Sequence, residues 1–217
     1  MTTPITREIV EQRYDALGYQ HGWTLMYTPA ATLRTAKFAF VGLNPGGGGD
    51  GDTYPYEGVW DEAAGNAYFD HDWGPGKGKA PIQLQIQKWH ELLGIGSGDS
   101  LCIQFVPFRS PSWHALEKQA EALAFAHELW SWILATSPAT HFLTMGKEPA
   151  LHLADIMNAE HILDLPAGWG RQTINVWESA SGRRIVAMPH PSRYRLFGRT
   201  DEKSQLAETN FRIAVGL

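Results

Sequence analysis

Apolar and polar residues alternate along the chain in blocks that predict strands separated by helices. Short apolar runs predict buried strands over 36–42, 100–108 and 140–146. Two β-rich segments on either side of a Ser-Ala-Ser-Gly turn predict a hairpin, with arms at 173–177 and 183–188. Apolar residues at helical spacing, with caps and stop signals, predict helices over 6–18, 81–95, 114–136, 147–157 and 201–217. This order predicts an α/β fold, a three-layer α/β/α sandwich with a mostly parallel central sheet and ligand sites at the carboxyl ends of its strands.

Composition limits the class of protein. The chain has 217 residues, of which 43% are hydrophobic, with no internal repeat and no evident linker, so we expect one domain over 1–217. No apolar run is long enough to span a bilayer and the N-terminus lacks a signal-peptide core, so we expect a cytoplasmic protein without a membrane partner. The single cysteine, Cys102, excludes an intrachain disulfide and a four-cysteine cluster, and its apolar surroundings predict a core residue.

Charge is distributed unevenly along the chain. The net charge is −5, which argues against a surface that is positive throughout. The range 183–203 nevertheless holds six basic residues and two acidic ones. Such a segment can form a DNA-facing rim, although a solvated basic patch is the more common explanation.

A glycine-rich stretch, VGLNPGGGGDGD, follows the first predicted strand and invites a phosphate-loop interpretation. A Walker loop requires lysine where Gly48 stands, and a dinucleotide-binding motif must open a helix, which this segment does not predict. The aspartates do not continue into a calcium-loop spacing. A flexible turn explains the later glycines but not the preceding Leu-Asn-Pro-Gly, and the long irregular segment 50–79 is more often functional than idle.

A second candidate motif, MPHPSRYR, follows the last predicted strand. His190 lies between two prolines, which hold the backbone extended and fix the direction of the imidazole. Because the chain has nine histidines, a structural role for His190 is the alternative.

Together, GLNPG at 42–46 and HPSR at 190–193 resemble two motifs of the uracil-DNA glycosylase superfamily. The first is most similar to the mismatch-specific and single-strand-selective branches, and the single cysteine excludes the branches that carry iron–sulfur clusters. The resemblance spans roughly residues 37–200. It implies a monomeric, monofunctional enzyme that needs no cofactor or metal and hydrolyses the N-glycosidic bond of uracil, or of a related deaminated base, in DNA.

The resemblance also implies roles for particular residues. Asn44 would orient the attacking water, and His190 would donate a hydrogen bond to uracil O2. The base pocket would be formed by Gly42, Leu43, Pro45, Gly46, Tyr56 and Gln104, with Tyr56 stacking on the base and Gln104 standing where several branches use an asparagine. Ser192 would bind a DNA phosphate, Arg193 or Tyr194 would fill the space left by the extruded nucleotide, and phosphates would pair with Arg195 and Arg199.

Several alternatives remain at this point. Asn44 can form an Asx-turn before Pro45, and Tyr56 can be a packed loop aromatic. A catalytically weak or inactive nucleic-acid or nucleotide-binding module with the same fold is favoured by Gln104 and by the acidic net charge. An unrelated α/β hydrolase would need a nucleophile or metal that the sequence does not offer, and the aromatic residues of 124–133 have the helical spacing of core positions.

Overall fold

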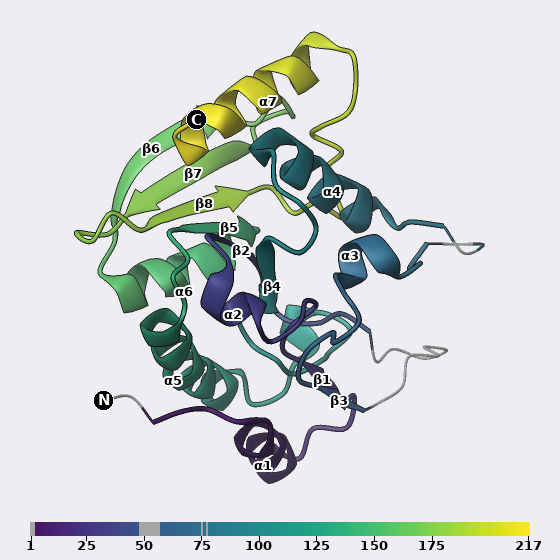
Figure 1. Ribbon diagram of the computed structural model, residues 1–217, viewed down its shortest axis with the longest axis vertical. Helices are drawn as coiled ribbons and strands as arrows, with labels where there is room; N and C mark the ends of the chain where they lie inside the picture. Colours follow the sequence, from purple (N-terminus) through teal and green to yellow (C-terminus); the bar gives the residue numbers. More distant parts are fainter. Residues whose placement is uncertain (1–2, 48–56, 75, 77) are drawn as a thin grey trace.

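The computed structural model describes residues 3–47, 57–74, 76 and 78–217, and its centre is a mixed six-stranded sheet (Figure 1). The strand order is β4 (Ser100–Gln104), β2 (Phe38–Gly42), β5 (His141–Met145), β8 (Arg184–Met188), β7 (Thr173–Glu178) and β6 (Glu160–Pro166). The first four strands are parallel, while β7 and β6 continue the sheet in antiparallel orientation. Separately, β1 (Trp23–Thr24) and β3 (Gly58–Val59) form a short parallel pair.

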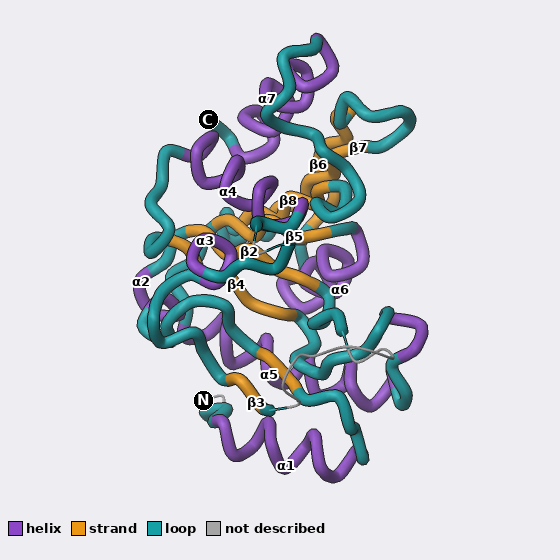
Figure 2. The backbone as a smooth tube through the Cα atoms, turned by 90° about the vertical axis from the view of Figure 1, so that its right-hand side faces the viewer, coloured by secondary structure: helices purple, strands orange, loops and turns teal. Residues whose placement is uncertain are grey.

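Helices cover both faces of this sheet (Figures 1 and 2). One face carries α2 (Thr32–Thr35), α5 (Gln119–Thr136) and α6 (Lys147–Met157), and the other carries α3 (Ala67–Asp70), α4 (Pro81–Leu93) and α7 (Glu202–Val215). The N-terminal α1 (Arg7–Leu17) packs against the first of these cores through Val10. The chain therefore has an α/β architecture with a mostly parallel central sheet flanked by helices.

The two cores follow from the alternation of side chains along each strand. In β2, Ala39 and Val41 point into the core shared with α5, whereas Phe40 points to the opposite core. There Phe40 meets Trp89 of α4 edge to face, with ring centroids 5.6 Å apart. Because both faces of the strand are covered, its sequence is continuously apolar, as is usual for a parallel strand.

Most of the predicted elements are confirmed, with several differences. Helix α5 begins at Gln119 rather than 114, because Lys118 adopts a left-handed conformation with φ 49° and a short 3₁₀ turn, Trp113–Ala115, precedes it. The strand predicted over 100–108 ends at Gln104. Strand β6, the β1–β3 pair and the short helices α2 and α3 were not predicted. Cys102 and the aromatic residues Phe125 and Trp130 are buried as predicted. No helix in the described part of the chain is both long and apolar enough to cross a membrane.

Candidate functional site

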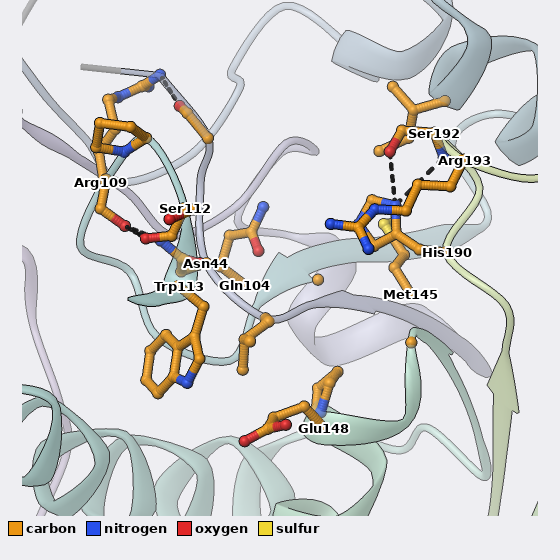
Figure 3. Close-up of a pocket in the computed structure, with 18 of the residues that line it drawn as sticks. Asn44, Gln104, Arg109, Ser112, Trp113, Met145, Glu148, His190, Ser192 and Arg193 are labelled. Atoms are coloured by element: carbon orange, nitrogen blue, oxygen red, sulfur yellow. Dashed lines mark hydrogen bonds between the residues drawn. The ribbon is translucent and has the colours of Figure 1, made fainter. Parts of the chain in front are cut away.

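A cavity of about 860 Å³ lies at the carboxyl ends of the four parallel strands (Figure 3). Gln104 ends β4, Gly42 ends β2, Met145 ends β5, and His190 follows the end of β8; all four residues line the cavity. This is where open parallel sheets usually place their ligand sites. Eight of the residues proposed from the sequence line it: Gly42, Leu43, Asn44, Gly46, Gln104, His190, Ser192 and Arg193.

Asn44 is held by its amide nitrogen. Nδ2 donates hydrogen bonds to Ser110 Oγ at 2.8 Å, to the Pro45 carbonyl at 3.2 Å and to the Phe108 carbonyl at 3.3 Å. Carbonyl oxygens can only accept, so these contacts fix which end of the amide carries the nitrogen. The Asx-turn, the alternative role for Asn44, is not formed, since no hydrogen bond joins the Gly46 N–H to Oδ1 in the described part of the chain. Among the described residues nothing donates to Oδ1, which therefore remains available as an acceptor.

Gln104 is 5% exposed and lies directly across from Gly42 in the β2–β4 register. A β-carbon on Gly42 would collide with the Gln104 carboxamide, so glycine at this position makes room for the side chain. Nε2 donates to the Tyr27 hydroxyl at 3.2 Å, while the buried Oε1 has no hydrogen-bond partner among the described residues. Because an unpaired buried acceptor costs about 1–3 kcal/mol, a ligand that donates to Oε1 would gain affinity there.

His190 presents one nitrogen to Ser192, and its other nitrogen has no hydrogen-bond partner in the part of the chain that the structure describes. Nδ1 lies 3.3 Å from the Ser192 backbone nitrogen and 2.8 Å from its Oγ. A backbone N–H can only donate, so Nδ1 is the acceptor and the neutral ring carries its proton on Nε2. Burial, and secondarily the charge of Arg193, lower the pKa of His190 to about 4. The ring is therefore neutral at physiological pH and offers Nε2–H as a hydrogen-bond donor.

An aromatic cluster that the sequence did not predict forms another part of the lining. The rings of Tyr27, Tyr68 and Trp73 meet edge to face, with centroids 5.1–5.6 Å apart, and all three residues line the cavity with Gln104. Trp73 lies in the irregular segment 50–79, which was expected to be functional. The irregularity of this segment was the only feature of the sequence that pointed to the cluster. Tyr56, the proposed stacking residue, lies outside the described residues.

Arg109 is a second residue that the sequence did not single out. It is 5% exposed, and its guanidinium donates to the Gly46 carbonyl at 2.8 Å and to Thr24 Oγ1 at 3.1 Å. These bonds tie the turn after β2 to the strand β1. Arg109 therefore supports the backbone beside Asn44.

Four of the proposed residues are not among those that line the cavity. Pro45 is buried and Arg195 is exposed on the surface. Tyr194 is half-buried, with its ring 6.1 Å from that of Trp169. Arg199 is ion-paired with Asp201 at 3.0 Å and its guanidinium lies 4.7 Å from the Trp169 ring centroid.

The basic segment 183–203 does not form one continuous rim. Arg184 stands at the start of β8, at the sheet edge opposite His190, where it binds Glu178 with bonds of 2.7 and 3.0 Å. Arg183 donates to the Ser137 carbonyl at 3.1 Å. The idea of a single basic edge is therefore wrong for these two arginines, because a strand separates them from the cavity.

The first turn of α6 also borders the cavity, through Gly146, Lys147 and Glu148. The unpaired N–H groups at the start of a helix favour negative charge nearby, and Lys147 adds a cation. No group of His, Cys, Asp or Glu side chains within the described ranges is arranged to hold a metal ion. The cavity thus combines hydrogen-bonding side chains, an aromatic wall and a locally positive border.

A scan against protein-family models found no match to this chain, and a search of curated proteins found none either.

Proposed function

We propose that the protein is a DNA glycosylase of uracil-DNA glycosylase type, which hydrolyses the N-glycosidic bond of uracil or a related deaminated base in DNA. One observation carries the proposal. Asn44, Gln104 and His190 reach one cavity from three strand ends, and each has a polar atom that no described residue bonds: the acceptors Oδ1 and Oε1, and the donor Nε2–H. These are the groups that a water molecule and a pyrimidine edge require.

The reaction adds water to C1′ of the deoxyribose while the bond from C1′ to the base nitrogen breaks. In our proposal, Asn44 Oδ1 accepts a hydrogen bond from the water and directs its oxygen toward C1′. The base departs with the bonding electrons, so negative charge gathers on its O2, where His190 Nε2–H donates a hydrogen bond. The departing nitrogen is finally protonated at the expense of the water. An amide is a poor base, so Asn44 orients the water rather than taking its proton.

Base recognition would rest on Gln104 and the aromatic cluster. Gln104 Oε1 can accept the N3–H of uracil, and the cluster supplies apolar surface for a base taken out of the stack. A β-carbon on Gly46 would have no atom within 4 Å, so this side of the cavity is open. We therefore expect substituted pyrimidines to be tolerated.

The proposal is tested with end-labelled oligonucleotides that contain one uracil. Incubation followed by alkali should cleave the strand at the uracil, and Asn44→Ala should reduce the rate of base release by about 10²-fold, because the water is no longer held in place. His190→Asn should reduce it as well, because the shorter asparagine side chain no longer brings a donor to O2. Gln12→Ala, a change of an exposed amide on α1, is the control and should behave as the wild type does. Undiminished release in both Asn44→Ala and His190→Asn would overturn the mechanism.

A second candidate is a nucleic-acid or nucleotide-binding module with weak or no turnover. It is favoured by the amide of Asn44, which is a poor base and cannot take a proton from the attacking water as a carboxylate at this position could. The same experiment separates the two. Retained DNA binding without release of any deaminated base would support the binding module.

A further inference from the structure

Trp169 is held on the surface by the turn between β6 and β7. It is 37% exposed, and the glycines on either side both have positive φ, 67° at Gly168 and 54° at Gly170. A β-carbon on Gly168 would collide with the backbone carbonyl of Lys203, so this glycine lets the turn lie against the start of α7. The backbone therefore fixes a large aromatic side chain in a partly exposed position.

A groove of about 640 Å³ lies beside Trp169, between 168–170 and 199–203. The Arg199 guanidinium lies 4.7 Å from the Trp169 ring centroid, and the Tyr194 ring meets it edge to face, at 70°. These two neighbours support the indole. Trp169 lines the groove and is 37% exposed, so part of this residue is open to a partner.

The groove lies on the same edge of the sheet as the candidate active site. Because β7 runs antiparallel to β8, the turn before β7 meets the edge where β8 ends (Figure 1). A smaller hollow of about 160 Å³ lies at the end of β8 and the start of β7, lined by Lys147, Arg171 and Gln172 among others. Lys147 also lines the large cavity, and Arg171 follows Gly170 of the groove in the chain. Lys147 thus joins the small hollow to the large cavity, and the step from Gly170 to Arg171 joins it to the groove.

Basic side chains accompany this path from several segments of the chain. They are Lys147, Arg171, Arg193, Arg199 and Lys203, and we call these residues together with Trp169 the Trp169 track. The acidic residues beside it are Glu148, Asp164, Asp201 and Glu202. Asp201 pairs with Arg199, and its Oδ1 accepts the Ser204 N–H at 3.0 Å as the cap of α7. Basic side chains therefore slightly outnumber acidic ones along the track, although the whole chain is acidic.

We propose that the Trp169 track binds single-stranded DNA next to the nucleotide in the cavity, with one unpaired base stacked on Trp169. This inference rests on the proposed function. Phosphates would follow the basic side chains, and the aromatic ring would take a base without regard to its sequence. In a duplex each base is already stacked on both sides, so Trp169 gains nothing there. The track therefore favours single-stranded over double-stranded substrates.

Binding can be measured by fluorescence anisotropy with uracil-free single strands and with the matching duplex. Trp169→Ala should weaken single-strand binding about 5- to 150-fold, the range for loss of one stacked base. Trp169→Phe keeps an aromatic face and should restore most of the affinity. Leu151→Ala is the matched control. It removes an exposed apolar side chain elsewhere, on α6, and should bind like the wild type. Circular dichroism confirms that each variant is folded.

Charge provides a second, independent readout. Arg171→Gln should make the slope of log affinity against log salt concentration shallower, by about the amount expected for one lost phosphate contact. Arg34→Gln, at an exposed arginine on α2, should leave the slope unchanged. Single strands extended one nucleotide at a time on either side of a uracil then show where the effect of Trp169 begins.

The proposal fails if Trp169→Ala binds single strands as the wild type does, or if duplex binding falls by the same factor. These outcomes are separate from the proposed function. If no uracil is ever released, the glycosylase assignment is lost, but the comparison of Trp169→Ala with Trp169→Phe on uracil-free strands still decides whether the track binds DNA.

Discussion

His190 should make the protein lose stability as the pH falls from neutrality toward 4. Burial and the neighbouring Arg193 lower its pKa to about 4 in the folded protein, while an unfolded chain has the ordinary value of 6.5. Between these two values the unfolded chain takes up a proton that the folded chain does not, and this uptake favours unfolding. Above 6.5 both states are neutral at this residue, and below about 4 both are protonated, so the loss is confined to the interval.

The size of the loss follows from the same two pKa values. Fully developed, the difference corresponds to about 3 kcal/mol. Because the ring is partly exposed at the cavity, water screens part of this penalty, and we expect about 1–2 kcal/mol between pH of about 7 and about 4.5. Arg193 is exposed, so its share of the effect should also shrink at high salt.

Urea unfolding of the wild type and of His190→Asn at both pH values measures this loss. Asparagine can accept the Ser192 N–H through its side-chain oxygen, as Nδ1 does, but it does not titrate. The pKa values of His90, His141 and His152 are also lowered, chiefly by burial, and these residues are common to both proteins. Their contributions therefore cancel in the difference. Free energies of unfolding that fall in parallel for the two proteins would refute the reasoning, because the pKa of His190 would then be the same in the folded and unfolded chains.

Three further predictions concern the same region. Gly42→Ala should lower the free energy of unfolding in urea by about 1–3 kcal/mol, because its new methyl group meets the Gln104 carboxamide, and Gln104→Ala in the same chain should recover most of the loss; no recovery would contradict this contact. Asn44→Asp should destabilise the protein by about 1–3 kcal/mol at neutral pH, since it turns a carboxylate toward the Phe108 and Pro45 carbonyls, and a melting temperature equal to that of the wild type would count against the assigned amide orientation. Burial raises the pKa of the Cys102 thiol to about 12, so a thiol reagent should label it only as fast as the protein opens, and rapid labelling under native conditions would be inconsistent with its burial.

The pattern of the sequence was sufficient for the parallel part of the sheet. Strands β2, β4 and β5 are covered on both faces, so apolar residues hold most of their positions and the signal is strong. The edge strand β6 was missed for the opposite reason, since most of its residues are half-exposed or exposed and its sequence mixes charged and apolar residues. The start of α5 was misplaced because a left-handed lysine, Lys118, ends the preceding segment, and no local signal marks such a residue.

The site was predictable where it lies at strand ends. Asn44, Gln104 and His190 each follow or end an apolar strand, and parallel strands bring their carboxyl ends to one edge. The aromatic cluster could not be predicted in this way. Tyr27, Tyr68 and Trp73 come from a loop after β1, from α3 and from the segment after it, and only the packing of α3 against the sheet brings them together.

The position of a basic residue in the sequence does not show whether it lies near the cavity in the fold. Arg184 and His190 are close in sequence, but β8 carries the chain across the sheet between them, so the arginine lies at the edge of the sheet opposite the cavity. Lys147 and Arg171 are remote from the basic segment in sequence, yet both line the hollow beside His190's edge of the sheet. Strand direction decides which residues lie at that edge. The ends of the parallel strands and the starts of antiparallel strands meet there, and the basic residues next to them therefore lie close together. A nucleic-acid strand could therefore be bound by a protein whose net charge is −5.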